Sequence, residues 1–371
     1  MTLLYALVSH RNRNYYEPRV PEAWKDAIRD RCFIEAIEVQ PPQRPKAEDA
    51  IEVQVACGSL NYSDLNMVHA GAAGLYGKHA VFGAEIAGWV RTARKSSAFK
   101  EGDLVVSRLL SRCRACSLCD KTRHRCILLA KQPRAAFQER LWLPEASIRK
   151  IPAGISPLQA AALQFSAAVA LDVLERCLDL KPGQTLLIAG ANSGIGTYLT
   201  QIAAGKRLTV INLIRSKSAM PHCLKNGAAA ALVTTSDHQV NGCQAQMYSG
   251  QVDAAIDLAA DFYGPQCLKL LKTGSTYIPV GWSGSRSSDP VQLHASVGSS
   301  IQLLTYRFQD GHNPLALLRD QQITPAIDSI YHYTEVEKAC ERAWWSQGRS
   351  GKVLIRFADP QACTTAAQVR Q

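Results

Sequence analysis

The chain has 371 residues, 47% of them hydrophobic, which is enough for two domains with a substantial core. Its net charge is +11, but it has no basic run interleaved with aromatic residues and no zinc-finger pair, so we expect no nucleic acid partner. No run of eighteen apolar residues occurs, so we also expect no membrane span.

The first part of the chain contains short segments in which apolar and polar residues alternate, a pattern that predicts half-buried strands. These segments are Leu3–Val8, Cys32–Val39 and Ala50–Ala56. The polar, basic stretch 9–31 between the first two predicts a long surface insertion. The start of the chain therefore reads as all-β rather than as a nucleotide-binding fold.

Four of the twelve cysteines are clustered with the spacing Cx2Cx2Cx6C. They are Cys113, Cys116, Cys119 and Cys126. Four thiolates at this spacing can close a tetrahedral structural zinc site; the alternatives are inherited cysteines that no longer bind metal, or reduced thiols in a loop.

The other eight cysteines are scattered, and the N-terminus lacks the apolar stretch and cleavage site of a signal peptide. We therefore expect reduced thiols in a cytoplasmic protein. Three early arginines, Arg11, Arg13 and Arg19, leave a mitochondrial presequence open, although Glu17 argues against it.

The stretch 184–217 predicts a strand, a glycine turn, a helix and a second strand. Leu186–Ala189 is a short apolar run, GANSGIG follows at 190–196, and Thr197–Ala204 continues as a helix before the apolar run Leu208–Ile214. Glycines let the backbone approach a diphosphate, and the start of a helix offers free N–H groups to it. We assign cofactor contacts to Ser193, Gly194, Ile195 and Gly196.

The second of these strands ends in Arg215, Ser216 and Lys217, where NAD-binding folds carry a carboxylate for the ribose hydroxyls. A guanidinium at that position suits a 2′-phosphate instead, which favours NADPH over NADH. The alternative is a solvated basic turn without a ligand.

Further strands and helices follow in alternation, which predicts a parallel sheet covered by helices. The predicted segments are the helix within Ser156–Leu180, the strands Ala231–Val233, Val252–Leu258, Ser275–Val280 and Ile301–Tyr306, the helix Gly264–Leu271, and the closing segments Leu315–Asp320, Tyr331–Trp345 and Lys352–Phe357.

Several motifs occur in a fixed order: GSLNYSD at 58–64, GAExxGxV at 83–90, EGDxV at 101–105, the cysteine cluster, the glycine turn, and GKVLI at 351–355. In this order they resemble the medium-chain dehydrogenase/reductase superfamily, which includes alcohol dehydrogenases, quinone oxidoreductases and enoyl reductases. The resemblance covers roughly residues 1 to 358.

The resemblance implies an α/β protein with a GroES-like β-barrel catalytic domain and a Rossmann domain with a doubly wound parallel sheet. We expect the catalytic domain at 1–155, the NADPH-binding domain at 156–312, a return to the catalytic domain at 313–358, and a flexible tail at 359–371. It also implies that Gly281 faces the nicotinamide and that the strand at 301–306 forms a homodimer edge.

Zinc-dependent members of the superfamily have a cysteine where this chain has Asn61, a histidine where it has Ala84, and a third ligand near Phe165. None of these residues can bind zinc, and Glu85 alone is not enough, because a catalytic zinc needs three protein ligands. The resemblance therefore points to a zinc-independent branch that retains the cysteine lobe. Such branches reduce activated double bonds.

The candidate catalytic residues are Asn61, Tyr62 and Tyr76. Either tyrosine, or water, could protonate the product of hydride transfer, and the Asn61 amide could donate to the substrate or the ribose. The alternatives are a buried structural Asn61, a Tyr62 that packs under the nicotinamide, and a surface aromatic at Tyr76.

The function expected is NADPH-dependent reduction of an enoyl thioester or an α,β-unsaturated carbonyl compound. The alternatives are a quinone oxidoreductase, a zinc-type alcohol dehydrogenase-like protein, and an NADPH-binding regulatory protein without activity. The expected partner is a small-molecule substrate, free or linked to CoA or an acyl carrier; basic residues around the cysteine cluster could hold such an acidic group or form a solvated face.

Overall fold

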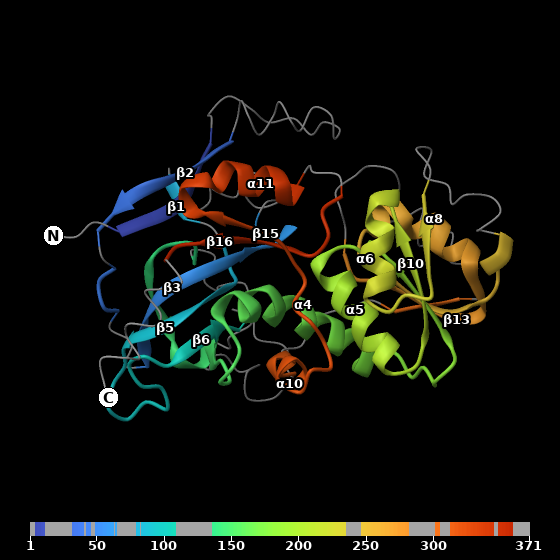
Figure 1. Cartoon of the computed structure of the whole chain (residues 1–371), viewed down its shortest axis with the longest axis horizontal. Coiled ribbons are helices and arrows are strands. Elements are labelled where there is room, and N and C mark those ends of the chain that lie inside the picture. The colour runs from blue at the N-terminus through green and yellow to red at the C-terminus, as the bar shows by residue number, and fades with distance from the viewer. Residues whose placement is uncertain are drawn as a thin grey trace. The chain divides into compact units, whose positions relative to one another are not determined.

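The computed structural model describes residues 4–11, 32–40, 42–45, 49–62, 64, 79–81, 83–108, 136–234, 246–281, 301–304, 312–344 and 348–358. Figure 1 shows the elements in chain order. The chain forms two compact units. The first unit comprises Met1–Phe165, Ile327–Ser346 and Lys352–Gln371, and the second comprises Ser166–Ala326 and Gln347–Gly351.

The first unit is built mainly from strands, as the alternating N-terminal segments predict. A three-stranded antiparallel sheet has the order β2-β1-β4, and a seven-stranded sheet has the order β15-β16-β3-β5-β6-β8 with β7 paired to β3. The strands are β1 Leu4–Arg11, β2 Cys32–Val39, β3 Ala50–Leu60, β4 His79–Val81, β5 Ile86–Thr92, β6 Leu104–Ser107, β7 Arg140–Pro144, β8 Ile148–Lys150, β15 Ile327–His332 and β16 Lys352–Arg356.

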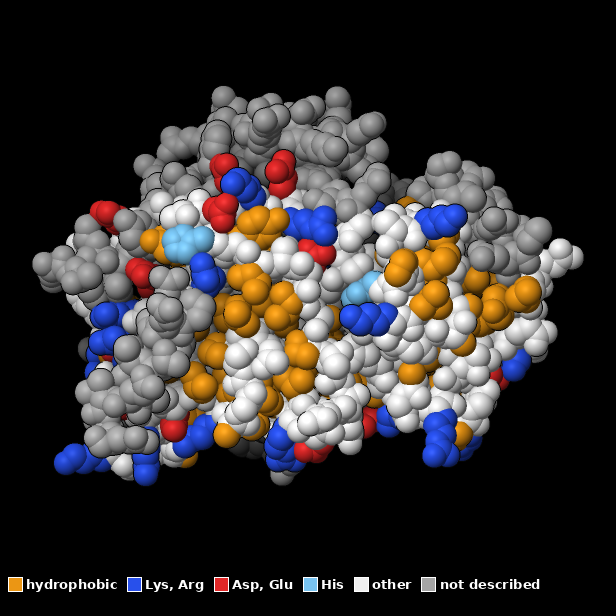
Figure 2. Space-filling model, in the orientation of Figure 1, with side chains coloured by type: hydrophobic (Ala, Val, Ile, Leu, Met, Phe, Trp, Pro, Cys, Tyr) orange, Lys and Arg blue, Asp and Glu red, His pale blue; other side chains and the backbone are white. Residues whose placement is uncertain are grey.

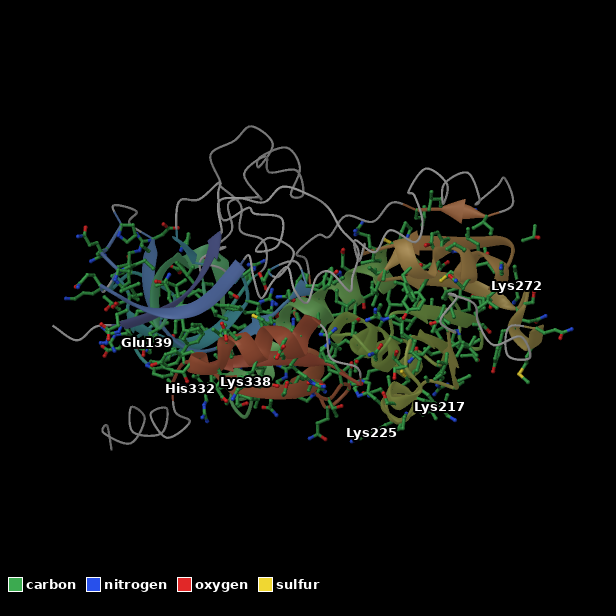
Figure 3. All side chains as sticks on the ribbon, turned by 90° about the horizontal axis from the view of Figure 1, so that it is seen from above. Glu139, Lys217, Lys225, Lys272, His332 and Lys338 are labelled. Carbon is green, nitrogen blue, oxygen red and sulfur yellow. The ribbon has the colours of Figure 1, made fainter. Side chains whose placement is uncertain are left out.

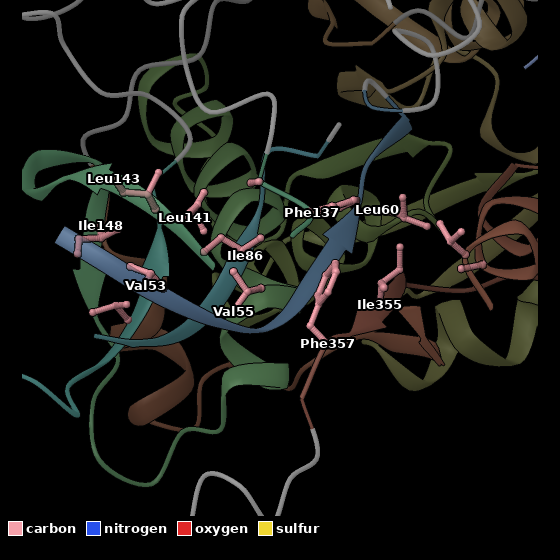
Figure 4. Close-up of a cluster of buried hydrophobic side chains, with 14 of the residues drawn as sticks. Val53, Val55, Leu60, Ile86, Phe137, Leu141, Leu143, Ile148, Ile355 and Phe357 are labelled. Atoms are coloured by element: carbon pink, nitrogen blue, oxygen red, sulfur yellow. The ribbon is translucent and has the colours of Figure 1, made fainter. Parts of the chain in front are cut away.

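Strand β3 is the centre of this unit because it pairs with β16, β5 and β7. Its first half alternates between buried and half-buried residues, and its second half is buried on both faces. Val53, Val55 and Leu60 contribute to the core shown in Figure 4, together with residues of the neighbouring strands and helix α11 (Val336–Trp344). Burial on both faces explains why this strand extends past the predicted end at Ala56.

The second unit contains a six-stranded parallel sheet in the order β11-β10-β9-β12-β13-β14. The strands are β9 Thr185–Ala189, β10 Thr209–Ile214, β11 Ala230–Val233, β12 Val252–Asp257, β13 Leu271–Pro279 and β14 Gln302–Leu303. The helices are α4 Pro157–Arg176, which begins in the first unit, α5 Gly194–Gly205, α6 Met220–Lys225, α8 Ala260–Leu270 and α10 Pro314–Arg319. Consecutive strands lie on both sides of β9, which is the arrangement of a doubly wound fold.

Helix α4 is the single described helix that is long and apolar enough to pass a test for a membrane span. Within that helix, 78% of the most apolar window is buried inside the protein, so packing explains its composition. Helix α5 begins at Gly194 rather than at the predicted Thr197, because Ser193 caps it by accepting a hydrogen bond from the Gly196 amide.

The positive charge is spread over the face of the molecule shown in Figure 2. Described lysine and arginine side chains on this face lie among acidic and neutral ones rather than in a single patch. The insertion was predicted at 9–31, but β1 continues to Arg11, so the prediction was wrong for residues 9–11. The rest of that segment, 12–31, the part of the predicted strand 301–306 after residue 304, and the tail at 359–371 lie outside the described residues.

Candidate functional site

The glycine turn at residues 190–196, which follows β9 and is called the cradle below, has no room for an additional side chain. Gly190 has a φ of +74°, which favours glycine, and a Cβ on Gly196 would lie 2.6 Å from backbone atoms of Ala191. The first amides of α5, those of Gly194 and Ile195, have no acceptor within the helix. The cradle therefore fits a diphosphate that approaches the backbone and accepts from these amides.

The cradle lies where the order of the sheet reverses, between β9 and β12. In open α/β sheets, ligands bind at the carboxyl ends of the strands at this reversal. Gly281 follows the end of β13, and a Cβ at that position would lie 2.3 Å from the carbonyl oxygen of Leu258, which follows β12. The glycine predicted to face the nicotinamide is thus at the same edge of the sheet as the glycine turn.

Four hydrogen bonds that the sequence did not reveal hold the cradle in place. The Thr197 hydroxyl donates its single hydrogen to the Ser193 carbonyl at 2.9 Å. It must therefore accept a hydrogen bond from Nε2 of the His222 ring, which lies 2.8 Å away. The Asn192 amide donates to the Arg349 carbonyl at 2.7 Å. The Gly351 amide in turn donates to the Asn192 carbonyl at 3.0 Å.

The predicted 2′-phosphate residues follow β10, next to the end of β9 in the parallel register. Arg215 and Lys217 are exposed, and Figure 3 shows Lys217 at the surface of the second unit. The Arg215 guanidinium lies 5.6 Å from the ring centroid of Phe262, a cation–π distance that restricts its position. The Ser216 hydroxyl lies 2.7 Å from that of Ser218. The set supplies a positive charge and hydroxyl groups suited to a phosphate.

A second cluster lies in the first unit, and strand register creates it. Leu60 at the end of β3 pairs with Val353 of β16, so the next step of this antiparallel ladder brings Asn61 opposite Lys352. On the other side of β3, the Ser59 amide donates to the Glu85 carbonyl at 2.9 Å. Three polar side chains from distant parts of the sequence therefore meet at one end of a central strand.

The three side chains form a closed polar network. The Lys352 ammonium donates to Asn61 Oδ1 at 2.6 Å and to Glu85 Oε2 at 3.2 Å. The Asn61 amide donates to the Ser59 carbonyl and to Glu85 Oε2, each at 3.2 Å, and Glu85 Oε1 accepts from the Phe165 amide at 2.7 Å. Lys352 is 4% exposed and Glu85 is 2% exposed, so their charges compensate one another away from water.

Asp64 completes this cluster. Its carboxyl accepts from the Asn61 backbone amide at 2.9 Å. Burial raises the pKa of Asp64 to about 6, although the Asn61 amide and the Lys352 charge act in the opposite direction. Asp64 therefore keeps its proton at pH values at which an exposed carboxyl has lost it.

A catalytic zinc does not fit this cluster. The resemblance to zinc-dependent members places ligands at positions 61 and 84 and near 165, and these three positions hold an amide, a methyl group and an aromatic ring. The Lys352 ammonium bonds to the first of these residues and lies 6.0 Å from the ring centroid of Phe165. A fixed positive charge would repel a divalent cation, and the described residues contain no group of three side chains able to bind a metal.

The predicted catalytic residues are only partly brought together. Asn61 is in the cluster, but both of its amide hydrogens already have acceptors. Tyr62 follows it in the chain and is 38% exposed. Tyr76 lies outside the described residues, as does the predicted zinc site at Cys113, Cys116, Cys119 and Cys126, so both remain predictions.

Sequence reasoning missed Lys352, Asp64 and His222. The only signal for Lys352 was a lysine at the start of an otherwise apolar strand, in the GKVLI motif. Asp64 was visible in the NYSD motif, but its burial was not.

Comparisons with known proteins agree with this fold. The family model for the alcohol dehydrogenase GroES-like domain matches residues 47–153. The quinone oxidoreductase of Pongo abelii is 22% identical over 280 residues, 74% of this chain and 78% of the relative. The acryloyl-coenzyme A reductase of Metallosphaera sedula is 22% identical over 334 residues, 86% of this chain and 96% of the relative.

Among solved structures, a mycobacterial protein in complex with NADPH has the same fold. Its TM-score is 0.71 and its sequence identity is 18%, with 95% of this chain and 99% of that chain covered. At this level of identity the likeness concerns the fold alone. The comparisons therefore agree with a GroES-like fold for the first unit and a Rossmann fold for the second, over the residues that the structure describes.

Proposed function

The chain belongs to the medium-chain dehydrogenase/reductase superfamily of oxidoreductases, and on that premise we propose that it uses NADPH to reduce an activated C=C double bond. The acceptor would be an enoyl thioester or an α,β-unsaturated carbonyl compound. The similarity to an acryloyl-coenzyme A reductase supports this substrate class. The chemistry requires a cofactor site, a way to polarise the acceptor, and a proton source.

One observation carries the choice of reaction. Of the positions that the resemblance to zinc-dependent members assigns to ligands, Asn61 belongs to the Lys352–Glu85–Asn61 network, and Ala84 and Phe165 offer no metal ligand. Alcohol oxidation at a zinc site depends on a Lewis acid that stabilises the alkoxide. An ammonium cannot bind an alkoxide as a metal does, but a hydrogen-bond donor is sufficient for a carbonyl oxygen that becomes an enolate.

The residues of the second unit fit the cofactor. Backbone amides of Gly194 and Ile195 would hold the diphosphate, and Arg215, with Ser216 beside it, would hold the 2′-phosphate. NADPH, when bound, supplies a hydride to the β-carbon of the acceptor. The small Gly281 keeps the backbone near the nicotinamide free of side chains.

The protein must then deliver a proton to the α-carbon of the acceptor. Tyr62, 38% exposed beside the polar network, is one candidate donor, and Tyr76 is another. Water is the third. Asn61 contributes by holding the Lys352 ammonium in position, because its own amide hydrogens are engaged.

The test is NADPH consumption with matched panels of enoyl thioesters, enones and quinones. We expect turnover with thioesters or enones and a product saturated at the α and β carbons, identified by mass spectrometry. NADH should be a poorer donor. Turnover confined to alcohols, or dependent on added zinc, would contradict the proposal.

Quinone reduction is the second candidate, since quinone oxidoreductases are among the relatives. A preference for quinones in the same panel, with hydroquinone as the product, would favour it. NADPH binding without turnover on any acceptor, combined with salt-sensitive RNA retention, would indicate a regulatory protein instead.

A further inference from the structure

The Lys352 ammonium is a buried charge whose bonding capacity is not used up by its neighbours. An ammonium has three hydrogens, and the described residues supply acceptors for two of them, Asn61 Oδ1 and Glu85 Oε2. Its side chain is only 4% exposed. A third acceptor oxygen at this site would complete the shell of hydrogen bonds that a desolvated ammonium requires.

A second polar group in the same place also lacks a partner. The Ser59 hydroxyl is fully buried and has no hydrogen-bond partner among the residues that the structure describes. Side chains alternate along a strand, so Ser59 lies on the same face at the end of β3 as Asn61. Two donors, an ammonium and a hydroxyl, are therefore available on the face that carries the polar network.

The network also fixes the position of the ammonium. Glu85 Oε1 accepts from the backbone amide of Phe165, and Asn61 is tied to the Ser59 carbonyl. Both acceptors of Lys352 are thus anchored to backbone groups. A donor held in this way needs little reorganisation when negative charge develops nearby, which is the condition for strong electrostatic stabilisation.

We propose that Lys352 is a catalytic residue that donates its third N–H to the substrate's carbonyl oxygen and takes over the electrostatic role of a metal. As the β-carbon gains the hydride and its electron pair, the π electrons of the double bond move toward the carbonyl and form an enolate. The ammonium stabilises this oxyanion without losing its own proton. The α-carbon then gains a proton from a tyrosine or water, which restores the carbonyl.

The inference rests on the proposed function, but a separate experiment tests it. Crotonyl-CoA serves as the acceptor and the crotonate anion as a probe of binding. The variants are Lys352→Met, which removes the charge and keeps the length, and Lys352→Met with Glu85→Gln, which removes the buried pair as a unit. Lys338→Met is the control, because Lys338 is exposed and pairs with Glu335 at 2.9 Å, away from the polar network.

Both Lys352 variants should lose about 100-fold or more in kcat, while the dissociation constant of NADPH stays within about threefold. Crotonate binding, measured by calorimetry, should weaken in both, and propylammonium should partly restore turnover in a Lys352→Ala variant. The control should match the wild type.

A purely structural role for Lys352 gives a different result. In that case the defect of Lys352→Met would come from the unpaired Glu85 carboxylate that it leaves buried. The double variant with Glu85→Gln removes this carboxylate, so its kcat would return to within about threefold of the wild type and it would bind crotonate normally. That outcome would overturn the role of Lys352 and leave the proposed function intact. Absence of turnover by the wild-type protein with every acceptor would remove both.

Discussion

The titration of Asp64 leads to a prediction about stability that depends on pH. Burial raises the pKa of this carboxyl from 3.8 to about 6 in the folded protein. Between pH 4 and 6 the folded state therefore binds more protons than the unfolded chain, so the free energy of unfolding falls as the pH rises through this window. Compared with a carboxyl that keeps its ordinary pKa on folding, Asp64 lowers the free energy of unfolding by about 3 kcal/mol above pH 7. This effect disappears below about pH 4.

Replacing Asp64 by Asn removes this pH-dependent contribution to the free energy of unfolding. The Asn side chain keeps an amide oxygen that can still accept from the Asn61 backbone amide. We expect Asp64→Asn to stabilise the protein by about 3 kcal/mol at pH 8 and by less than about 1 kcal/mol at pH 4. Urea unfolding of both proteins at the two pH values measures this difference, with the slopes compared to confirm that the same transition is followed.

Asp103 provides a control of opposite sign in the same unit. Burial would raise the pKa of Asp103, but the hydrogen bond from Lys150 and other contacts hold it below its ordinary value. Asp103→Asn should therefore destabilise the protein more at pH 8 than at pH 4. If Asp64→Asn changed the stability equally at both pH values, the assigned effect of burial would be wrong.

Three further predictions concern the cofactor and the metal. Gly196→Ala should abolish NADPH binding measured by fluorescence, since a Cβ there would lie 2.6 Å from the backbone, whereas Gly205→Ala, with open space around it, should bind normally. Arg215→Glu should weaken NADPH binding by about 10-fold or more and spare NADH, with Lys225→Glu as the exposed control; equal effects on both cofactors would contradict the 2′-phosphate assignment. Native mass spectrometry should find about one zinc per chain that resists mild chelation and is lost in Cys119→Ser, and two tightly held metals would refute the metal assignment.

Local sequence was sufficient for the nucleotide-binding half of the protein. The apolar run Leu186–Ala189, the glycine turn and the run Leu208–Ile214 correspond to β9, the cradle and β10 with small shifts at their ends. The reason is that these residues are adjacent in the chain, so turn chemistry and strand periodicity act within one short segment. The start of α5 was misplaced because glycines are poor helix formers, and the Ser193 cap outweighs that propensity.

The polar cluster of the first unit depended on the tertiary structure. Asn61 and Lys352 are separated by 291 residues, and no local pattern relates them. The register between β3 and β16 brings them together, and burial between neighbouring strands turns an ordinary lysine into a fixed charge.

The sequence by itself determined the order of the elements, the glycine cradle and the residue types at positions 61, 84 and 165, because each is a property of residue type and spacing along the chain. Only the folded structure decided that Lys352 meets Asn61 and Glu85, because strand pairing is non-local and a shift of one residue would turn Lys352 to the opposite face. The folded structure also engages the Asn61 amide, because one of its hydrogens bonds to the nearby Ser59 carbonyl and the other reaches Glu85 only when β3 and β5 are paired.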